Sequence, residues 1–149
     1  MAKLVANPAL KRDERTWEMD CVELFVARDM YSKAFTQFIV SAGGTRYDGR
    51  KVAVKEGGVP GYVSEVEQWN PDWSFAVKKG KTTWTAEMVI PMSVLGGPPK
   101  PGEVWAMNFC RERQTRPKQE LSTWSPLVTS SSEDSFKAVP RFGLITFTD

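Results

Sequence analysis

Residues 21–27 read CVELFVA, and this stretch decides the fold class. In an extended chain, successive side chains point to opposite faces. One face of this segment then carries Val22, Leu24 and Val26, while the other carries Cys21, Glu23 and Phe25. Residues 34–42, AFTQFIVSA, are also apolar on both faces and end at Gly43 and Gly44, a hairpin-type turn. We therefore expect the strand at 34–42 to lie between a core and a second surface of aromatic and aliphatic side chains.

Six further segments are expected to be strands: residues 45–48, 73–79, 82–90, 103–113, 121–126 and 142–148. The clearest is TTWTAEMVI at 82–90, where Trp84, Ala86, Met88 and Ile90 alternate with mostly polar side chains. Residues 91–95 can form at most one helical turn. Many short strands and no long amphipathic helix predict an all-β fold, an antiparallel β-sandwich of the jelly-roll or immunoglobulin-like type.

The length and charge of the chain limit its organisation and its partners. With 149 residues it suits a single domain spanning residues 1–149. The net charge of +2 and the scattered Lys and Arg residues argue against a nucleic-acid partner. No segment approaches the roughly 20 apolar residues that cross a bilayer, so no membrane partner is expected. Residues 1–17 lack the apolar core of a signal peptide.

The chain contains no histidine, which removes the commonest general base and the commonest transition-metal ligand. Ser-His-Asp and Cys-His catalytic arrangements are therefore excluded, and a zinc site would need the two cysteines together with carboxylates. Cys21 and Cys110 are compatible with one disulfide, but two buried free thiols are favoured, because free cysteine is commonly buried. The sequence assigns no catalytic residue and leaves the metal content open.

Acidic residues allow two further functions to be weighed. A glycosidase needs two carboxylates about 5–10 Å apart across a cleft. Asp20 and Glu23 are three positions apart on a strand, so they point to opposite faces and do not form such a pair. Oxygen atoms of Asp48, Asn70 and Asp72 suit calcium, although capping of turns is the favoured role for each. A structural calcium is therefore left open, and no cofactor is required.

Six tryptophans are a high number for this length. The alternation of residues 82–90 and 103–113 turns Trp84 and Trp105 inward, so both are expected in the core. Trp17 lies in the strongly polar context DERTWEMD, where burial of an indole has no evident reason. A flat aromatic face beside carboxylates and amides suits a sugar, because the ring stacks on C–H groups while polar groups bind the hydroxyls.

Six short motifs, in order along the chain, then suggest a family. They are WEMDCVELF at 17–25, QFIV at 37–40, WTAEMVIP at 84–91, LGGPPKPGEVWAMN at 95–108, WSP at 124–126 and PRFG at 140–143. Together they resemble the signature of family 9 carbohydrate-binding modules and the broader family-9-like, DOMON-related domains. The resemblance implies a β-sandwich fold and secretion of the parent protein.

The resemblance also implies a sugar site, since family members hold terminal sugar units between two aromatic side chains. By position, Trp17 and Phe136 correspond to these two aromatics. The remaining sugar-binding candidates are polar: Glu23, Gln37, Asn108 and Arg111. Alternation would nevertheless turn Arg111 toward the face of Trp105. Ile39 stands where the family carries a basic contact residue, and Cys110 where it can carry an amide.

The function implied is non-catalytic binding of a plant or microbial polysaccharide such as xylan or cellulose. The partner would be a polysaccharide or oligosaccharide, and the parent protein would carry a linked catalytic domain of the glycoside hydrolase type. Family members usually open with strands before the 17–25 motif, so we expect an N-terminally truncated domain. The sheet edge exposed in this way predicts self-association into a homo-oligomer.

Three alternatives remain. One is a structural or interaction β-sandwich that has lost its sugar site, consistent with Ile39 and Phe136. Another is an enzyme that cleaves polysaccharides. The third is a haem-binding DOMON domain, which would need axial ligands, and methionines such as Met88 and Met107 are expected to point inward.

Overall fold

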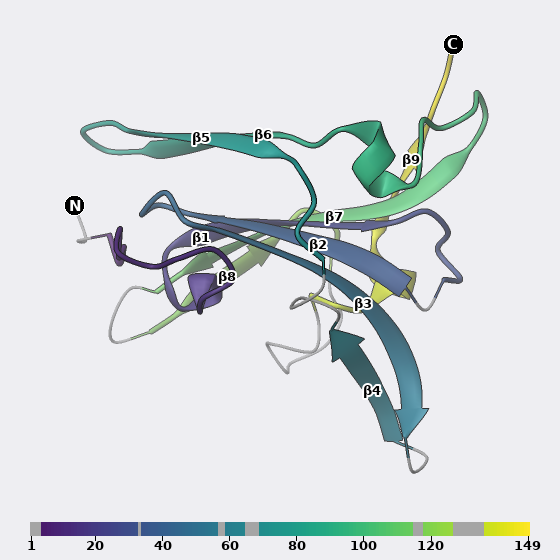
Figure 1. Ribbon diagram of the computed structural model, residues 1–149, viewed down its shortest axis with the longest axis horizontal. Coiled ribbons are helices and arrows are strands. Elements are labelled where there is room, and N and C mark those ends of the chain that lie inside the picture. Colours follow the sequence, from purple (N-terminus) through teal and green to yellow (C-terminus); the bar gives the residue numbers. More distant parts are fainter. Residues whose placement is uncertain (1–3, 33, 57–58, 65–68, 115–117, 127–135) are drawn as a thin grey trace.

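Strands dominate the computed structural model, which describes residues 4–32, 34–56, 59–64, 69–114, 118–126 and 136–149 (Figure 1). The strands are β1 (Cys21–Ala27), β2 (Ala34–Ser41), β3 (Arg46–Glu56), β4 (Val59–Ser64), β5 (Ser74–Lys79), β6 (Trp84–Val89), β7 (Val104–Arg113), β8 (Glu120–Thr123) and β9 (Gly143–Thr146). Three short 3-10 helices accompany them in the described residues: η1 (Thr16–Glu18), η3 (Met92–Leu95) and η4 (Val139–Arg141). The predicted all-β class is confirmed.

The strands form two antiparallel sheets. The main sheet has seven strands in the order β4-β3-β2-β1-β7-β8, with β9 pairing the other end of β7. The second sheet is the hairpin of β5 and β6, which lies over one face of the main sheet (Figure 1). This arrangement is a β-sandwich, as predicted. The second sheet is short, so it covers only part of the main sheet, and Phe109 of β7, which shares the face of Leu24, stays half-exposed.

Both faces of the main sheet are apolar, which explains the pattern of β1. Leu24 and Val26 face the second sheet and pack with Trp105 and with residues of β2, β5 and β6. Phe25 and Ala27 face the other way and pack with aromatic side chains that include Phe35, Phe136 and Phe142. The strand is therefore buried from both sides, and it lies near the centre of the sheet between β2 and β7.

Two elements differ from the sequence expectation. The strand expected at residues 45–48 is β3, which runs through Arg46–Glu56, and its partner β4 (Val59–Ser64) was not predicted. RYDGRKVAVKE contains a glycine and six charged residues, so its own pattern is weak. Pairing with β2 over seven positions, from Val40↔Arg46 to Ala34↔Val52, supplies the backbone partners that hold it extended. Most of the loop that follows Pro126 lies outside the described residues.

Burial agrees with the expectations for the two cysteines and for Trp105, but not for Trp84. Cys21 and Cys110 are free and buried, as the favoured interpretation predicted. Trp105 is 1% exposed, as expected for the core. Trp84 was expected there too but is only half-buried, because it is the first residue of β6, at the end of the short second sheet. None of the described helices has the length and apolar character needed to span a bilayer.

Asp48 has a structural role that the sequence did not reveal. Its side chain is fully buried on β3, and its Oδ1 accepts hydrogen bonds from Arg12 Nη2 at 2.6 Å and from Trp73 Nε1 at 3.0 Å. Arg12 Nη2 also donates to the carbonyl of Pro71 at 3.0 Å. Asp48 thus ties the N-terminal segment and the approach to β5 onto the main sheet. Calcium binding here stays a prediction.

Candidate functional site

A polar pocket of about 470 Å³ lies on the face of the main sheet that points away from the second sheet. Strands β1, β2, β3 and β7 form its floor, and η1 and the segment around Phe136 form parts of its wall. The lining residues are Trp17, Glu18, Glu23, Phe25, Gln37, Tyr47, Lys51, Glu112, Gln114, Gln119, Phe136 and Lys137. These residues together form the polar pocket.

The strand register explains why these side chains meet. Glu23 on β1 is directly opposite Ile39 on β2, which is opposite Tyr47 on β3. On its other side Glu23 is opposite Cys110 of β7. Directly opposite residues point to the same face of an antiparallel sheet. Every second residue of four neighbouring strands is therefore presented to one pocket.

Trp17 lies at the rim of the polar pocket with 41% of its surface exposed. It belongs to η1, a single turn closed by a hydrogen bond from the Met19 amide to the Thr16 carbonyl at 3.2 Å. The indole meets the ring of Tyr47 edge to face, with centroids 5.4 Å apart and planes at 87°. Gln114 Nε2 donates to the Trp17 carbonyl at 2.9 Å, which attaches the turn to the end of β7. The indole is thus held in place while much of it stays accessible.

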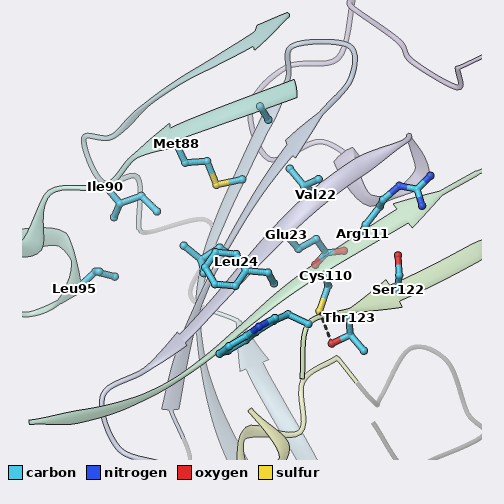
Figure 2. Close-up of a pocket in the computed structure, with 13 residues that line it drawn as sticks. Val22, Glu23, Leu24, Met88, Ile90, Leu95, Cys110, Arg111, Ser122 and Thr123 are labelled. Carbon is cyan, nitrogen blue, oxygen red and sulfur yellow. Dashed lines mark hydrogen bonds between the residues drawn. The ribbon is translucent and has the colours of Figure 1, made fainter. Parts of the chain in front are cut away.

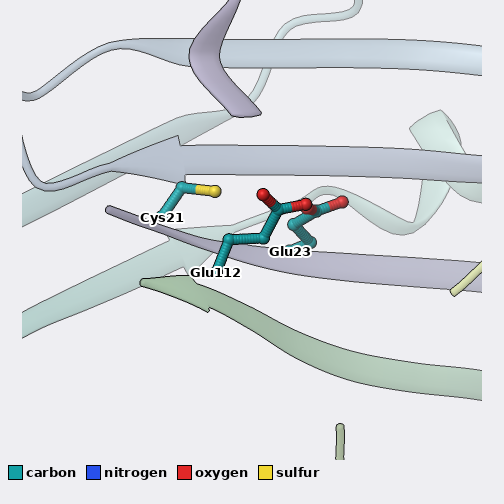
Figure 3. Close-up of side chains that lie close together, drawn as sticks. All are labelled: Cys21, Glu23 and Glu112. Atoms are coloured by element: carbon teal, nitrogen blue, oxygen red, sulfur yellow. The ribbon is translucent and has the colours of Figure 1, made fainter. Parts of the chain in front are cut away.

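Two carboxyl groups form the polar floor of the polar pocket. Glu23 is 3% exposed and accepts a hydrogen bond from Gln37 Nε2 at 2.7 Å. Its carboxyl also hydrogen-bonds with that of Glu112. Figure 3 shows the two side chains pointing toward one another beside Cys21, and their oxygens and the Cys21 sulfur lie within 4.8 Å of one another. Glu112 accepts further hydrogen bonds from Gln114 Nε2 at 2.9 Å and Gln119 Nε2 at 3.0 Å.

Burial controls the charge of this cluster. Desolvation raises the pKa of Glu23, and the hydrogen bonds from Glu112 and Gln37 only partly oppose it. We infer that Glu23 and Glu112 share one proton, since two carboxylates in contact do not both ionise readily. Burial, reinforced by the charge of Glu23, also raises the pKa of the Cys21 thiol. A protonated thiol is a poor metal ligand, so this cluster does not favour a thiolate metal site.

The pKa of Glu23 leads to a pH-dependent prediction for its amide variant. Because the pKa of Glu23 is higher in the folded protein than its unfolded value of about 4.5, the protonated carboxyl contributes fully to the stability of the fold at pH values below 4.5. This contribution is lost as the pH rises through the folded-state pKa. Glu23→Gln keeps the shape and stays neutral. In urea unfolding we expect it to exceed the wild type in free energy of unfolding at pH 8 and to lose that advantage at pH 4. Glu87→Gln, at an exposed position of β6, should show the same pH dependence of the free energy of unfolding as the wild type. If Glu23→Gln also shows the wild-type pH dependence, the raised pKa of Glu23 is refuted.

Four of the six sugar-site candidates line the polar pocket: Trp17, Glu23, Gln37 and Phe136. Phe136, however, is only 5% exposed and packs on Phe25 with centroids 6.5 Å apart. It is part of the pocket wall and of the core beneath it. The ring in contact with Trp17 is Tyr47, which the sequence reasoning missed. Gln37 brings a buried oxygen, Oε1, that has no hydrogen-bond partner among the described residues.

Asn108 is brought close to the polar pocket but not into it. It is opposite Phe25 and fully buried, and its Oδ1 accepts hydrogen bonds from Thr123 Oγ1 at 2.9 Å and the Ser125 amide at 3.0 Å. These bonds attach the end of β8 to β7. Asn108 therefore lies on the same face of the main sheet as the polar pocket but does not belong to the pocket lining.

The structure places Arg111 on the other face of the main sheet, away from the polar pocket. It is opposite Val22, one position out of phase with Glu23, as alternation predicted. There it borders an apolar pocket of about 680 Å³ between β1, β6 and β7, lined mainly by Val22, Leu24, Ala86, Met88, Ile90, Leu95, Phe109 and Trp124. Figure 2 shows Met88, Ile90 and Leu95 on the side opposite Leu24. These eight residues together form the apolar pocket.

Several residues of the polar pocket were missed by the sequence reasoning: Tyr47, Lys51, Glu112, Gln114, Gln119 and Lys137. Tyr47 and Lys51 are four positions apart on one strand, so recognition of β3 as a long strand would have placed them on one face. Glu112 is at least 61 positions away from Tyr47 and Lys51, so no local pattern in the sequence connects it with them. The three side chains meet only because β1 and β2 pair in register between β3 and β7.

Comparison with known proteins shows the fold and leaves the family open. No protein-family model and no curated protein matches the sequence. The structure is similar to a crystal structure of a protein from Bacteroides uniformis that is provisionally named a carbohydrate-binding protein. The TM-score is 0.68 at 21% sequence identity, over 98% of this chain and 67% of the neighbour's. The chain therefore shares the β-sandwich of that neighbour, and the resemblance to family 9 modules continues to rest on the short motifs.

Proposed function

We propose that the chain is a non-catalytic carbohydrate-binding domain whose polar pocket holds a terminal sugar unit of a polysaccharide. The observation that supports this best is the combination of an exposed indole at the rim, Trp17, with a floor of carboxyl and amide groups. An aromatic face stacks on the C–H side of a pyranose, and the polar groups exchange hydrogen bonds with its hydroxyls. The volume lies within the roughly 300–1,000 Å³ typical of small-molecule pockets.

Binding without catalysis is favoured by the geometry of the carboxyl pair. Glycosidases place their two carboxyl groups about 5 Å or more apart so that the sugar lies between them. Glu23 and Glu112 are hydrogen-bonded to each other, and Gln37 also holds Glu23. No glycosidic bond fits between groups in direct contact. The same side chains are suited to exchange hydrogen bonds with sugar hydroxyls.

The neighbour from Bacteroides uniformis supports the proposal at a general level, because that protein is provisionally named as carbohydrate-binding. The motif resemblance supports a finer version of it: a single domain that serves a secreted parent protein and directs a linked catalytic domain to xylan or cellulose. It also supports a DOMON-related origin. Met88 and Met107, the methionines considered for haem, pack against the core between the two sheets.

Replacement of Trp17 tests the proposed function. We expect a calorimetric titration with cellobiose or xylo-oligosaccharides to show binding that Trp17→Ala weakens at least about 10-fold, since truncation of a tryptophan that anchors a binding site typically costs about 2 kcal/mol or more. Binding should also weaken with end-reduced sugars if the terminal unit is held. Trp124→Ala is the matched control, because Trp124 is 53% exposed and borders the apolar pocket. Equal affinities for Trp17→Ala and wild type would contradict the site.

A second candidate function, protein interaction, is favoured by the apolar pocket. Exposed Phe109 and Trp124 pack edge to face beside it, with centroids 5.9 Å apart. No described strand pairs the outer edge of β6, which offers backbone groups to a strand from a second copy. Folded protein that gives no heat with any sugar and has the mass of a dimer would favour this function over the first.

A further inference from the structure

A second hollow adjoins the polar pocket at η1. It has a volume of about 540 Å³ and shares two lining residues with the polar pocket, Trp17 and Glu18. Its walls come from the chain before β1, which is purple in Figure 1. The residues that line this hollow and not the polar pocket are Asn7, Leu10, Asp13, Glu14, Arg15 and Met19. Together with Trp17 and Glu18 they form the outer pocket.

Trp17 is the boundary between the two pockets. Its indole is 41% exposed, and it takes part in the lining of both. A sugar unit on the floor of the polar pocket leaves the rest of its polymer above the rim, and on the side of η1 that rim includes Trp17. A polymer that leaves over this side therefore passes directly into the outer pocket.

The outer pocket contains both kinds of group that a pyranose needs. Leu10 and Met19 are half-buried and offer apolar surface to the C–H groups of a sugar. The Oδ1 of Asn7 accepts a hydrogen bond from a backbone amide at 3.0 Å, which fixes the side chain, and its NH2 group has two donors for hydroxyl oxygens. Glu14 accepts from a backbone amide at 2.8 Å, and its carboxylate offers further acceptor sites for hydroxyl protons. A sugar unit can thus be held by its apolar and its polar side.

The wall of the outer pocket is preorganised, although most of it is loop. The Asp13 amide donates to the Arg46 carbonyl at 3.0 Å, and Asp13 Oδ1 accepts from the Asp48 amide at 3.1 Å, which attaches the loop to β3. A Cβ added at Gly43 would lie 3.0 Å from the carbonyl oxygen of Asn7, so the loop also packs closely on the turn between β2 and β3. Because the wall is already ordered before a ligand arrives, binding there costs less conformational entropy.

We propose that the outer pocket binds the sugar unit next to the terminal one, so that the domain recognises a disaccharide and the polymer leaves the polar pocket past Trp17. This inference rests on the proposed function, because it extends the same sugar site from one unit to two. The volumes of about 470 and 540 Å³ both lie within the roughly 300–1,000 Å³ typical of small-molecule pockets. Trp17 would contact both sugar units, whereas Asn7 and Leu10 would contact only the second.

The experiment compares sugars of one and two units. Calorimetric titrations with xylose and xylobiose, and with glucose and cellobiose, measure what the second unit contributes to affinity. For at least one pair we expect the disaccharide to bind about 10-fold or more tightly, which corresponds to roughly 1.4 kcal/mol. The affinity of a monosaccharide that is too weak for direct titration is measured by its competition with the disaccharide.

A double variant assigns this gain to the outer pocket. Asn7→Ala combined with Leu10→Ala removes a hydrogen-bonding group and an apolar contact, and it changes no residue of the polar pocket. The gain from the second unit should fall to about 2-fold or less, because both kinds of contact with that unit are lost. Affinity for the monosaccharide should stay at the wild-type level, which also shows that the variant is folded. Lys11→Ala is the matched control, since Lys11 is an exposed residue of the same loop that lines neither pocket, and it should leave both affinities unchanged.

Three results would overturn the inference and leave the sugar-binding function intact. One is equal affinity for the monosaccharide and the disaccharide in both pairs. Another is a disaccharide preference that survives in the double variant, because the second unit would then lie elsewhere. The third is an equal loss of affinity for one and two units in the double variant. Folded protein that binds none of the four sugars would count against the proposed function itself, and against the inference with it.

Discussion

Asp48→Ala is expected to lower the free energy of unfolding by about 3–5 kcal/mol, the usual cost of breaking a buried charge pair by removal of one partner. Asp48 is fully buried, and its carboxylate is the acceptor for both Arg12 and Trp73 Nε1. The variant leaves an indole N–H unpaired in the core and a guanidinium whose remaining carboxylate partner is Asp13, at 3.8 Å. Chemical denaturation followed by tryptophan fluorescence measures the loss.

Asp72→Ala is the matched control for this prediction. Asp72 is exposed and precedes Trp73 directly, so its removal should change stability by no more than about 0.5 kcal/mol. Similar effects for the two variants would show that the Arg12–Asp48–Trp73 network does not hold the N-terminal segment. The same two variants also test for calcium binding. If added calcium stabilises the wild type but neither variant, the result would support the predicted calcium site.

Phe25→Ala is the second change with a large expected effect, about 3–5 kcal/mol, because it leaves a cavity in the core. Phe25 is fully buried on β1 and packs on Phe35 and Phe142 with centroids 5.9 Å and 5.8 Å apart. It also forms part of the floor of the polar pocket. We therefore expect sugar affinity to fall even at temperatures where the variant is folded.

Two variants control for nonspecific effects of losing an aromatic ring. Phe25→Leu keeps most of the apolar volume and should cost markedly less than the alanine variant. Phe109→Ala removes a ring that is 49% exposed on the opposite face of the sheet, so a loss of about 1 kcal/mol and unchanged sugar binding are expected. If Phe109→Ala lost as much sugar affinity as Phe25→Ala, the result would contradict a sugar site on the face of the main sheet that carries Phe25.

Part of the candidate site could be predicted from the sequence because it lies in one local pattern. Trp17 and Glu23 belong to a single nine-residue motif, and Gln37 to the strand that pairs with it. Alternation also placed Arg111 on the other face correctly. Phe136 was assigned by position alone, and position does not report burial, so its packing on Phe25 was not foreseen.

The sequence by itself determined the all-β class, the course of β1 and the presence of two apolar faces. These depend on alternation within a segment, which is a local property. Only the tertiary structure decided the register, and with it the meeting of Lys51, Glu23 and Glu112 in one pocket. Register is fixed by pairing between distant segments and by the burial of both faces at once, and a shift of one residue would turn each side chain to the opposite face.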